Sequence, residues 1–301
     1  MSKLGIIISN EYRTDISSKS FWISTLVVPV IFFAFSMFGG YMLSESDTAM
    51  TMQEGFFAGP DNSEITPLKL VGLLMGMFLT IFIMIYGSQI FAKVKTEKTN
   101  RIVEILATSV DGRTMMLAKI ISVGLVGLTQ ILIWAALIAV ILTGTFMVFT
   151  VDIAWSSLLA WKYIMAVVWG VVYFFGGYVF FGSLFAAVGA MTDKNNENQE
   201  YVAILTFLLL ISFYIGEYAV DHGSATFVRV CSYIPFTSPT IGAVNAITQT
   251  APVWESLLSV AILYASAWLM LALSGKIYSS SIMLKGKRFS PRDIITFLRT
   301  K

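Results

Sequence analysis

Residues 120–144 read IISVGLVGLTQILIWAALIAVILTG, an apolar run without a single Lys, Arg, Asp or Glu. A hydrocarbon core about 30 Å thick is crossed by about 20 apolar residues in a helix. Within lipid, every backbone N–H and C=O has to be satisfied inside the segment, so a run of this length predicts a transmembrane α-helix. A buried strand would be far shorter, commonly about 5–6 residues.

Five further long apolar stretches are found along the chain, with charged residues only near their ends. They are residues 21–43, 68–91, 163–191, 201–220 and 253–274. We interpret the first as a retained span and not as a cleaved signal peptide, because it is too long for an h-region and no small-residue cleavage pattern follows it. The sequence therefore predicts an all-α integral membrane protein, with six transmembrane helices in one domain over residues 1–301.

The composition agrees with a chain that faces lipid over much of its surface. Only 13% of the 301 residues are charged, against about a quarter in soluble domains, and the mean hydropathy is +0.77. One cysteine, Cys231, and one histidine, His222, exclude an internal disulfide framework and a Cys/His metal cluster. We expect no metal site, no catalytic constellation and no nucleic-acid partner.

The basic residues predict how the spans are oriented. If the N-terminus is cytoplasmic, 17 of the 20 Lys and Arg residues fall on the inside, and only Lys69, Lys162 and Arg229 fall outside. This bias is the one that the positive-inside rule describes. We therefore expect a multi-pass protein of a bacterial or archaeal cytoplasmic membrane, in contact with lipid and with both termini inside.

Two terminal segments are predicted to lie beside the membrane. Residues 1–20 form an amphipathic helix whose apolar positions recur every four residues, at Leu4, Ile8, Tyr12 and Ile16. This helix lies in the headgroup plane, which we favour, or packs on the helix bundle. The tail, residues 276–301, is basic and is expected to bind the anionic inner leaflet electrostatically.

The cytoplasmic loop between spans two and three has the pattern of a short amphipathic helix at residues 97–108, ended by Asp111-Gly112. Its apolar side carries Ile102, Ile105 and Leu106, and its charged side carries Glu97, Arg101 and Glu104. One interpretation is a helix that docks into a partner protein. The other is a charged turn with ordinary helix pairs, Glu97 with Arg101 and Arg101 with Glu104. The pattern alone favours neither.

Residues 222–252 are predicted to lie outside and are unusually apolar for a loop. Pro235 and Pro239, with Ser238 between them, divide the segment into halves that are too short to span a bilayer. Two short helices that dip into the outer leaflet are allowed where protein buries their ends. We favour such a re-entrant hairpin over the alternative, an interface with a partner in the outer leaflet.

Few polar groups interrupt the spans. Glu217 lies near the outer end of span five, where a position at the membrane interface explains a carboxylate better than contact with an exported cation. For Gln89 and Gln130 we favour hydrogen bonds between helices. A substrate path lined by these three residues is the alternative. Gly72-x-x-x-Gly76 allows close packing, either inside the chain or at a dimer seam.

Three segments together resemble one known family. EKTNRIVEILATSV, residues 97–110, resembles the coupling-helix loop of the type 2 ABC exporter permeases. YIPFTSP, residues 233–239, is similar to their Pro-x-x-Ser-Pro turn, and NEYRTDISSKSFWISTLVVPV, residues 10–30, resembles their amphipathic elbow and first span. The sodium-efflux and related permeases fit best, over nearly the whole chain. The short loop between the first two spans departs from many relatives, which insert a large extracellular domain there.

The resemblance implies the transmembrane permease subunit of an ATP-binding cassette exporter, working as two copies or beside a sister permease. Residues 97–108 would lie in a groove of a separate ABC ATPase. The chain contains no G-x-x-x-x-G-K-[ST] motif, so ATP and Mg²⁺ are expected on that partner. We expect this chain to bind no cofactor and not to be an enzyme itself.

Two other classes compete with this interpretation. A stand-alone secondary transporter or channel would favour inverted repeats or broken helices near the midplane, and the two halves of the chain show no convincing similarity. A membrane-embedded enzyme would need clustered acid groups, and residues 193–200, DKNNENQE, form the sole acidic-amide cluster of the sequence.

Overall fold

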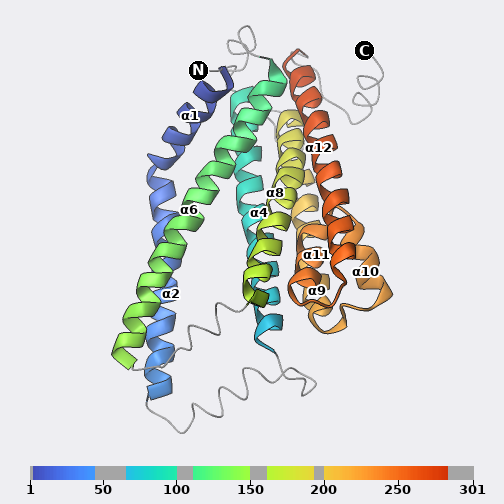
Figure 1. Ribbon diagram of the computed structural model, residues 1–301. Coiled ribbons are helices and arrows are strands. Elements are labelled where there is room, and N and C mark those ends of the chain that lie inside the picture. The colour runs from blue at the N-terminus through green and yellow to red at the C-terminus, as the bar shows by residue number, and fades with distance from the viewer. Residues whose placement is uncertain (1–2, 45–65, 100–110, 150–160, 193–199, 284–301) are drawn as a thin grey trace.

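The long helices run side by side and form one bundle (Figure 1). The computed structural model describes residues 3–44, 66–99, 111–149, 161–192 and 200–283. Within these ranges the chain forms helices and no strand, as predicted for an all-α protein. The helices are α1 (Lys3–Ile16), α2 (Lys19–Ser44), α4 (Pro67–Thr99), α6 (Gly112–Phe149), α8 (Trp161–Met191), α9 (Glu200–His222), α10 (Thr226–Tyr233), α11 (Ser238–Ile247) and α12 (Val253–Met283).

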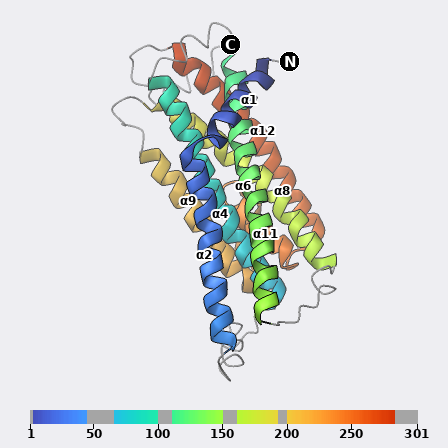
Figure 2. The ribbon, with the colours of Figure 1, turned by 90° about the vertical axis from the view of Figure 1, so that its left-hand side faces the viewer.

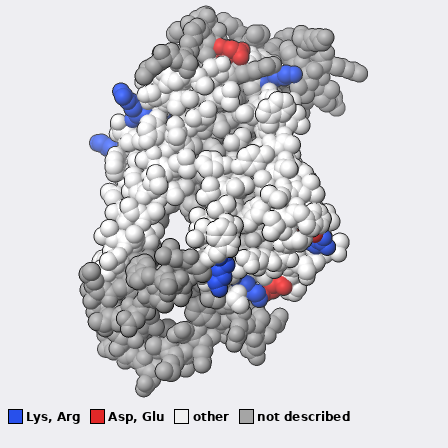
Figure 3. All heavy atoms as spheres, viewed as in Figure 1, with Lys and Arg blue, Asp and Glu red and all other residues white. Residues whose placement is uncertain are grey.

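Five of these helices, α4, α6, α8, α9 and α12, are long and apolar enough to cross a membrane. Charged side chains on the face seen in Figure 3 gather toward the two ends and leave an uncharged band between them. Helix α2 coincides with the predicted first span, but its described apolar part covers only Lys19–Ile31. The sixth crossing therefore stays a prediction.

Helix α8 occupies the centre and packs chiefly against α4 and α12. Most of its residues from Tyr173 to Ala190 are buried, whereas Val167, Val168 and Val171 in its first half are exposed. Tyr173, Phe181 and Phe185 on this helix are completely buried. From this central position α8 contacts α4, α11 and α12.

Helices α1 and α2 are attached to the bundle mainly through α6, which lies beside them in both views (Figures 1 and 2). The indole of Trp134 donates a 2.9 Å hydrogen bond to the carbonyl of Thr25. Tyr12 and Ile16, from the predicted apolar face of α1, pack against the main core, whereas Arg13 is exposed. The apolar face of α1 is thus turned toward the bundle, and its placement in a headgroup plane stays a prediction.

Helices α10 and α11 form a hairpin whose turn, residues 234–237, lies against the middle of the long helices. Every residue of α11 is buried, among α4, α8, α9, α10 and α12. Two short helices separated at Pro235 are confirmed. Pro239 lies in the first turn of α11, where a missing N–H and a fixed φ are tolerated.

The close approach of α11 to its neighbours requires glycine on α4. A Cβ on Gly76 would come within 2.9 Å of Val244 Cγ2, and a Cβ on Gly72 within 2.8 Å of Thr248 Cγ2. The Gly72-x-x-x-Gly76 face is therefore occupied by packing inside the chain, which favours that alternative over a dimer seam.

Candidate functional site

Charged side chains from three helices meet near the end of the bundle that holds the N-terminus (Figure 1). We call this set, with the two hydroxyl groups bonded to it, the polar end cluster. Its members are Glu11 and Asp15 of α1, Lys93 and Glu97 of α4, Lys119 and Ser122 of α6, and Tyr278 of α12.

Lys119 is the centre of the polar end cluster. Its side chain is 2% exposed, and its Nζ lies 2.9 Å from Glu11 Oε1 and pairs with Glu97 as well. The second oxygen of Glu11 accepts a 2.8 Å hydrogen bond from Ser122, and that of Glu97 accepts one of 3.3 Å from Tyr278. Because a buried charge without a partner is strongly destabilising, Lys119 requires these carboxylates.

Lys93 provides a second connection between α4 and α1. Its ammonium pairs with Asp15 and lies 3.8 Å from Glu11 Oε2. The Lys93 and Asp15 side chains are about one quarter exposed. Solvent therefore screens this pair more than it screens Lys119, and we assign it the smaller contribution to holding α1 in place.

Only one of the predicted coupling residues lies within the described structure, which has a gap between residues 99 and 111. Glu97 lies in the last turn of α4 and belongs to the polar end cluster. Arg101, Ile102, Glu104, Ile105 and Leu106 lie outside the described residues. The predicted pair of Glu97 with Arg101 stays a prediction, whereas the pair of Glu97 with Lys119 was missed from the sequence. A lysine directly before an apolar run, as at Ala118-Lys119-Ile120, was the available signal.

Hydroxyl groups hold the turn of the α10–α11 hairpin. Ser259 donates to the carbonyl of Ser232 at 2.5 Å, so the 2.9 Å contact between the Ser238 and Ser259 hydroxyls has Ser238 as donor. All three serines are buried. Of the predicted turn residues, Ser238 and Pro239 thus lie inside the protein, and Pro235 is half-buried.

Two more hydroxyls join the hairpin to α9 and α4. Ser212 donates to the carbonyl of Thr237 at 3.1 Å. Thr80 donates to the carbonyl of Gly76, and its oxygen lies 3.3 Å from the Thr240 hydroxyl. Several backbone groups of the turn therefore have partners within the protein, which favours a turn at membrane depth, where water is not at hand to bind them.

A carboxylate–guanidinium pair fixes the base of the hairpin. Arg229 of α10 binds both oxygens of Glu255, in the first turn of α12, with Nε at 3.0 Å from Oε2. The Glu255 side chain is 4% exposed, and that of Arg229 is about half exposed. Hydrogen bonding to Glu255 raises the pKa of Arg229 above its ordinary value, so the guanidinium stays charged.

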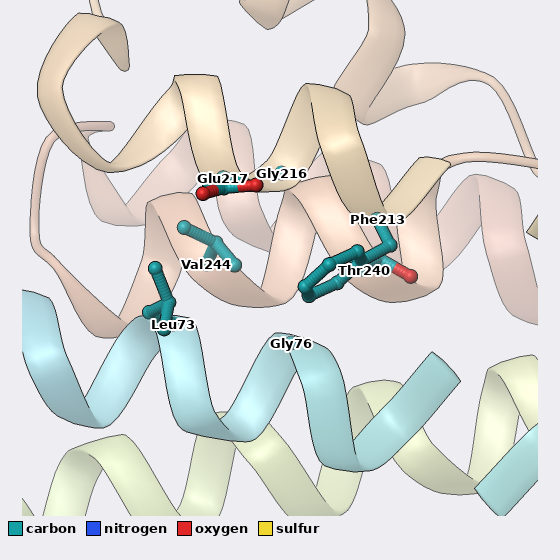
Figure 4. Close-up of a pocket in the computed structure, with 7 residues that line it drawn as sticks. All are labelled: Leu73, Gly76, Phe213, Gly216, Glu217, Thr240 and Val244. Carbon is teal, nitrogen blue, oxygen red and sulfur yellow. The ribbon is translucent and has the colours of Figure 1, made fainter. Parts of the chain in front are cut away.

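The three residues of the predicted substrate path are not brought together. Glu217 is exposed beside a shallow depression that has no room for a water molecule (Figure 4). Leu73, Gly76, Phe213, Gly216, Glu217, Thr240 and Val244 line the depression. Gln89 is exposed on α4, about 20 Å along the helix from Gly76. Gln130 is buried and accepts a hydrogen bond from Tyr86.

Among the described residues, no group of His, Cys, Asp or Glu side chains is placed to hold a metal ion. The polar end cluster fits this finding, because the ammonium groups of Lys93 and Lys119 already lie between its carboxylates. Both sets of polar groups therefore join helices. The polar end cluster does so through ion pairs, and the α10–α11 hairpin through hydroxyl groups and Arg229.

Comparison with known proteins supplies the family. A model described as ABC-2 family transporter protein matches residues 62–276. The chain is 27% identical over 242 residues to the uncharacterized protein YhaP of Bacillus subtilis (strain 168), covering 76% of this chain and 55% of YhaP. It is 24% identical over 249 residues to the uncharacterized protein MJ1024 of Methanocaldococcus jannaschii, covering 83% of this chain and 57% of that protein.

The chain thus spans a little over half the length of these curated relatives. No solved structure matches it. The family match runs from the residues just before α4 to the last turns of α12, and so takes in the five apolar helices and the hairpin. With most of its length matched in this way, the chain belongs to the ABC-2 family of transporter proteins and is a multi-pass membrane protein.

Proposed function

We propose that the chain is the transmembrane permease subunit of an ABC exporter, which moves a substrate outward with ATP hydrolysed by a separate partner. The observation that carries the proposal is the ABC-2 family match over residues 62–276, which contains five apolar helices of membrane-spanning length. The sequence has no phosphate-binding G-x-x-x-x-G-K-[ST] motif, so ATP and Mg²⁺ would bind to the partner.

The chain would cross a bacterial or archaeal cytoplasmic membrane six times, with α2 as the first crossing and both termini inside. The distribution of lysine and arginine supports this orientation. Lys93 and Lys119 would then lie on the cytoplasmic side, and Lys69, paired with Asp221 at 2.8 Å, on the outer side. The α10–α11 hairpin would be re-entrant, because its turn lies beside the middle of α8 and several of its backbone groups are bonded within the protein.

The segment that begins in the last turn of α4, residues 97–108, would dock into the ATPase. Helix α4 supports this role by its length, since 33 residues extend about 50 Å against a hydrocarbon core of about 30 Å. With lipid around residues 68–91, as the sequence predicts, its final turns would project beyond the lipid toward a cytoplasmic partner. Two copies of the chain, or one copy with a sister permease, would enclose the substrate path.

In this arrangement, closure of the ATPases would displace the docked segments and shift the bundle between inward-facing and outward-facing states. Glu217 and Gln89 are exposed and free to line a path completed by the second permease. Gln130 is less suited to that role, since its carbonyl oxygen is already bonded to Tyr86 inside the bundle.

The proposal is tested by purifying the tagged chain from its own host in mild detergent and assaying for a retained, vanadate-sensitive ATPase. We expect the wild-type chain to retain it and Ile105→Asp to lose it. Ile6→Asp is the matched control, because Ile6 is an isoleucine already 55% exposed on α1, at the same end of the bundle. A chain that transports while free of any ATPase would instead be a stand-alone transporter, and an Ile105→Asp variant that keeps the ATPase would refute the docking site.

A further inference from the structure

Lys119 is shared between two helices that are far apart in the chain. Glu11 approaches it from α1 and Glu97 from the end of α4, while Lys119 itself belongs to α6. The side chain of Lys119 is almost completely buried, so its ammonium is held by protein groups and not by water. A displacement of Glu97 therefore acts on the same ammonium that holds Glu11.

Two further hydrogen bonds fix the carboxylates that contact the Lys119 ammonium, and so determine which helices a movement of Glu97 would affect. Ser122, one turn beyond Lys119, fixes the second oxygen of Glu11, and Tyr278 fixes the second oxygen of Glu97. Hydrogen bonds to charged groups are stronger than neutral ones and restrict geometry more tightly. The two carboxylates thus connect α1, α4, α6 and α12 at one point.

Helix α4 ends at Thr99, two residues after Glu97. The segment that follows is the one proposed above to dock into the ATPase, so this inference rests on the proposed function. We propose that Lys119 is the positioning residue that transmits movement of the α4 end to α1. Helix α1 then moves as one unit with the docked segment, and does not remain a passive anchor beside the membrane.

The first part of the test uses the chain alone in lipid nanodiscs and needs no ATPase. Ile8→Cys, at a half-buried position of α1, reports opening of α1 through its labelling rate with a water-soluble maleimide. The native Cys231, buried in the α10 helix of the hairpin, reports general unfolding in the same sample. Lys119→Met should raise labelling at position 8 roughly tenfold, as expected for losing a charge-assisted hydrogen bond, and leave Cys231 slow.

The decisive variant in this part is Glu97→Gln, which changes α4 and not α1. We expect it to raise labelling at position 8 severalfold, and to add nothing in a Lys119→Met background. Lys119→Arg, which keeps a cation between the carboxylates, should label as the wild type does. Lys276→Met is the matched control, because Lys276 is exposed on α12 toward the same end. An unchanged rate at position 8 in Glu97→Gln, or an equal rise at Cys231, would overturn the inference.

The second part uses the complex with its retained ATPase. ATP with vanadate should change labelling at position 8 in the wild type and leave it unchanged in Lys119→Met, with the ATPase still bound in both. A wild-type response in Lys119→Met would overturn the inference. Failure of the wild-type chain to retain any ATPase would overturn the proposed function, while the transmission from Glu97 to α1 would still be decided by the nanodisc measurements.

Discussion

Pro239, in the first turn of α11, lies directly against Gly177 in the middle of α8. A Cβ placed on Gly177 would come within 2.6 Å of the Pro239 Cβ, a distance that real Cβ atoms do not show. The tip of the hairpin can reach half-way along the bundle only because α8 has no side chain at this position. Gly177 therefore decides how deep the hairpin sits.

Gly177→Val should push the hairpin tip away from α8. We expect a loss of about 1–3 kcal/mol in unfolding free energy, the usual cost of overpacking, measured as a lower thermal midpoint of the purified protein. Gly144→Val on α6 is the matched control, because a Cβ there meets nothing within 4 Å. Equal midpoints for the two variants would show that the hairpin tip does not depend on this contact.

Arg229 and Glu255 should contribute to stability mainly through their interaction with each other. Arg229→Met leaves the buried Glu255 carboxylate without its bidentate partner, so we expect a clearly lower thermal midpoint. The double variant Arg229→Met with Glu255→Met removes both charges and should recover much of the loss. A double-mutant cycle measures this coupling, and additive losses would mean that the pair does not fix the hairpin.

The lengths of the apolar runs allowed the helices to be predicted, but not their ends. Spans four and five, predicted at residues 163–191 and 201–220, agree closely with α8 and α9. Span six was predicted at residues 253–274, and the helix that contains it, α12, continues to Met283. A window of hydropathy detects the hydrocarbon core, whereas a helix continues into water until its sequence or its packing stops it.

The polar end cluster could not be predicted, because its pairs join residues as far as 181 positions apart. Patterns along one helix identify partners three or four residues away, such as Glu97 with Arg101, and contain no information on which helices are neighbours. The hairpin was easier to predict. Pro235 and Pro239 within an apolar segment too short to span mark both a break and a buried environment in the sequence itself.

Gln130 should be a structural residue. Both Gln130 and Tyr86 are buried, and Gln130→Leu leaves the Tyr86 hydroxyl without its acceptor, at a cost of about 1–3 kcal/mol. Adding Tyr86→Phe should return much of that stability. Gln89→Leu is the control, since Gln89 is exposed on α4 and its change should stay within about 0.5 kcal/mol. Thermal midpoints check all three, and a stable Gln130→Leu variant with impaired transport would place Gln130 in the substrate path instead.

The orientation can be measured with single cysteines in a Cys231→Ala background, labelled by an impermeant maleimide on intact cells. Thr66→Cys, exposed before α4, should react from outside, and Glu200→Cys, exposed at the start of α9, only after the cells are opened. Ser20→Cys and Glu54→Cys flank the apolar part of α2, so a first crossing requires that Glu54→Cys react from outside and Ser20→Cys not. Because the orientation was inferred from where lysine and arginine fall, labelling of Ser20→Cys and Glu200→Cys on intact cells would reverse it. It would also place the polar end cluster beyond the reach of any cytoplasmic ATPase.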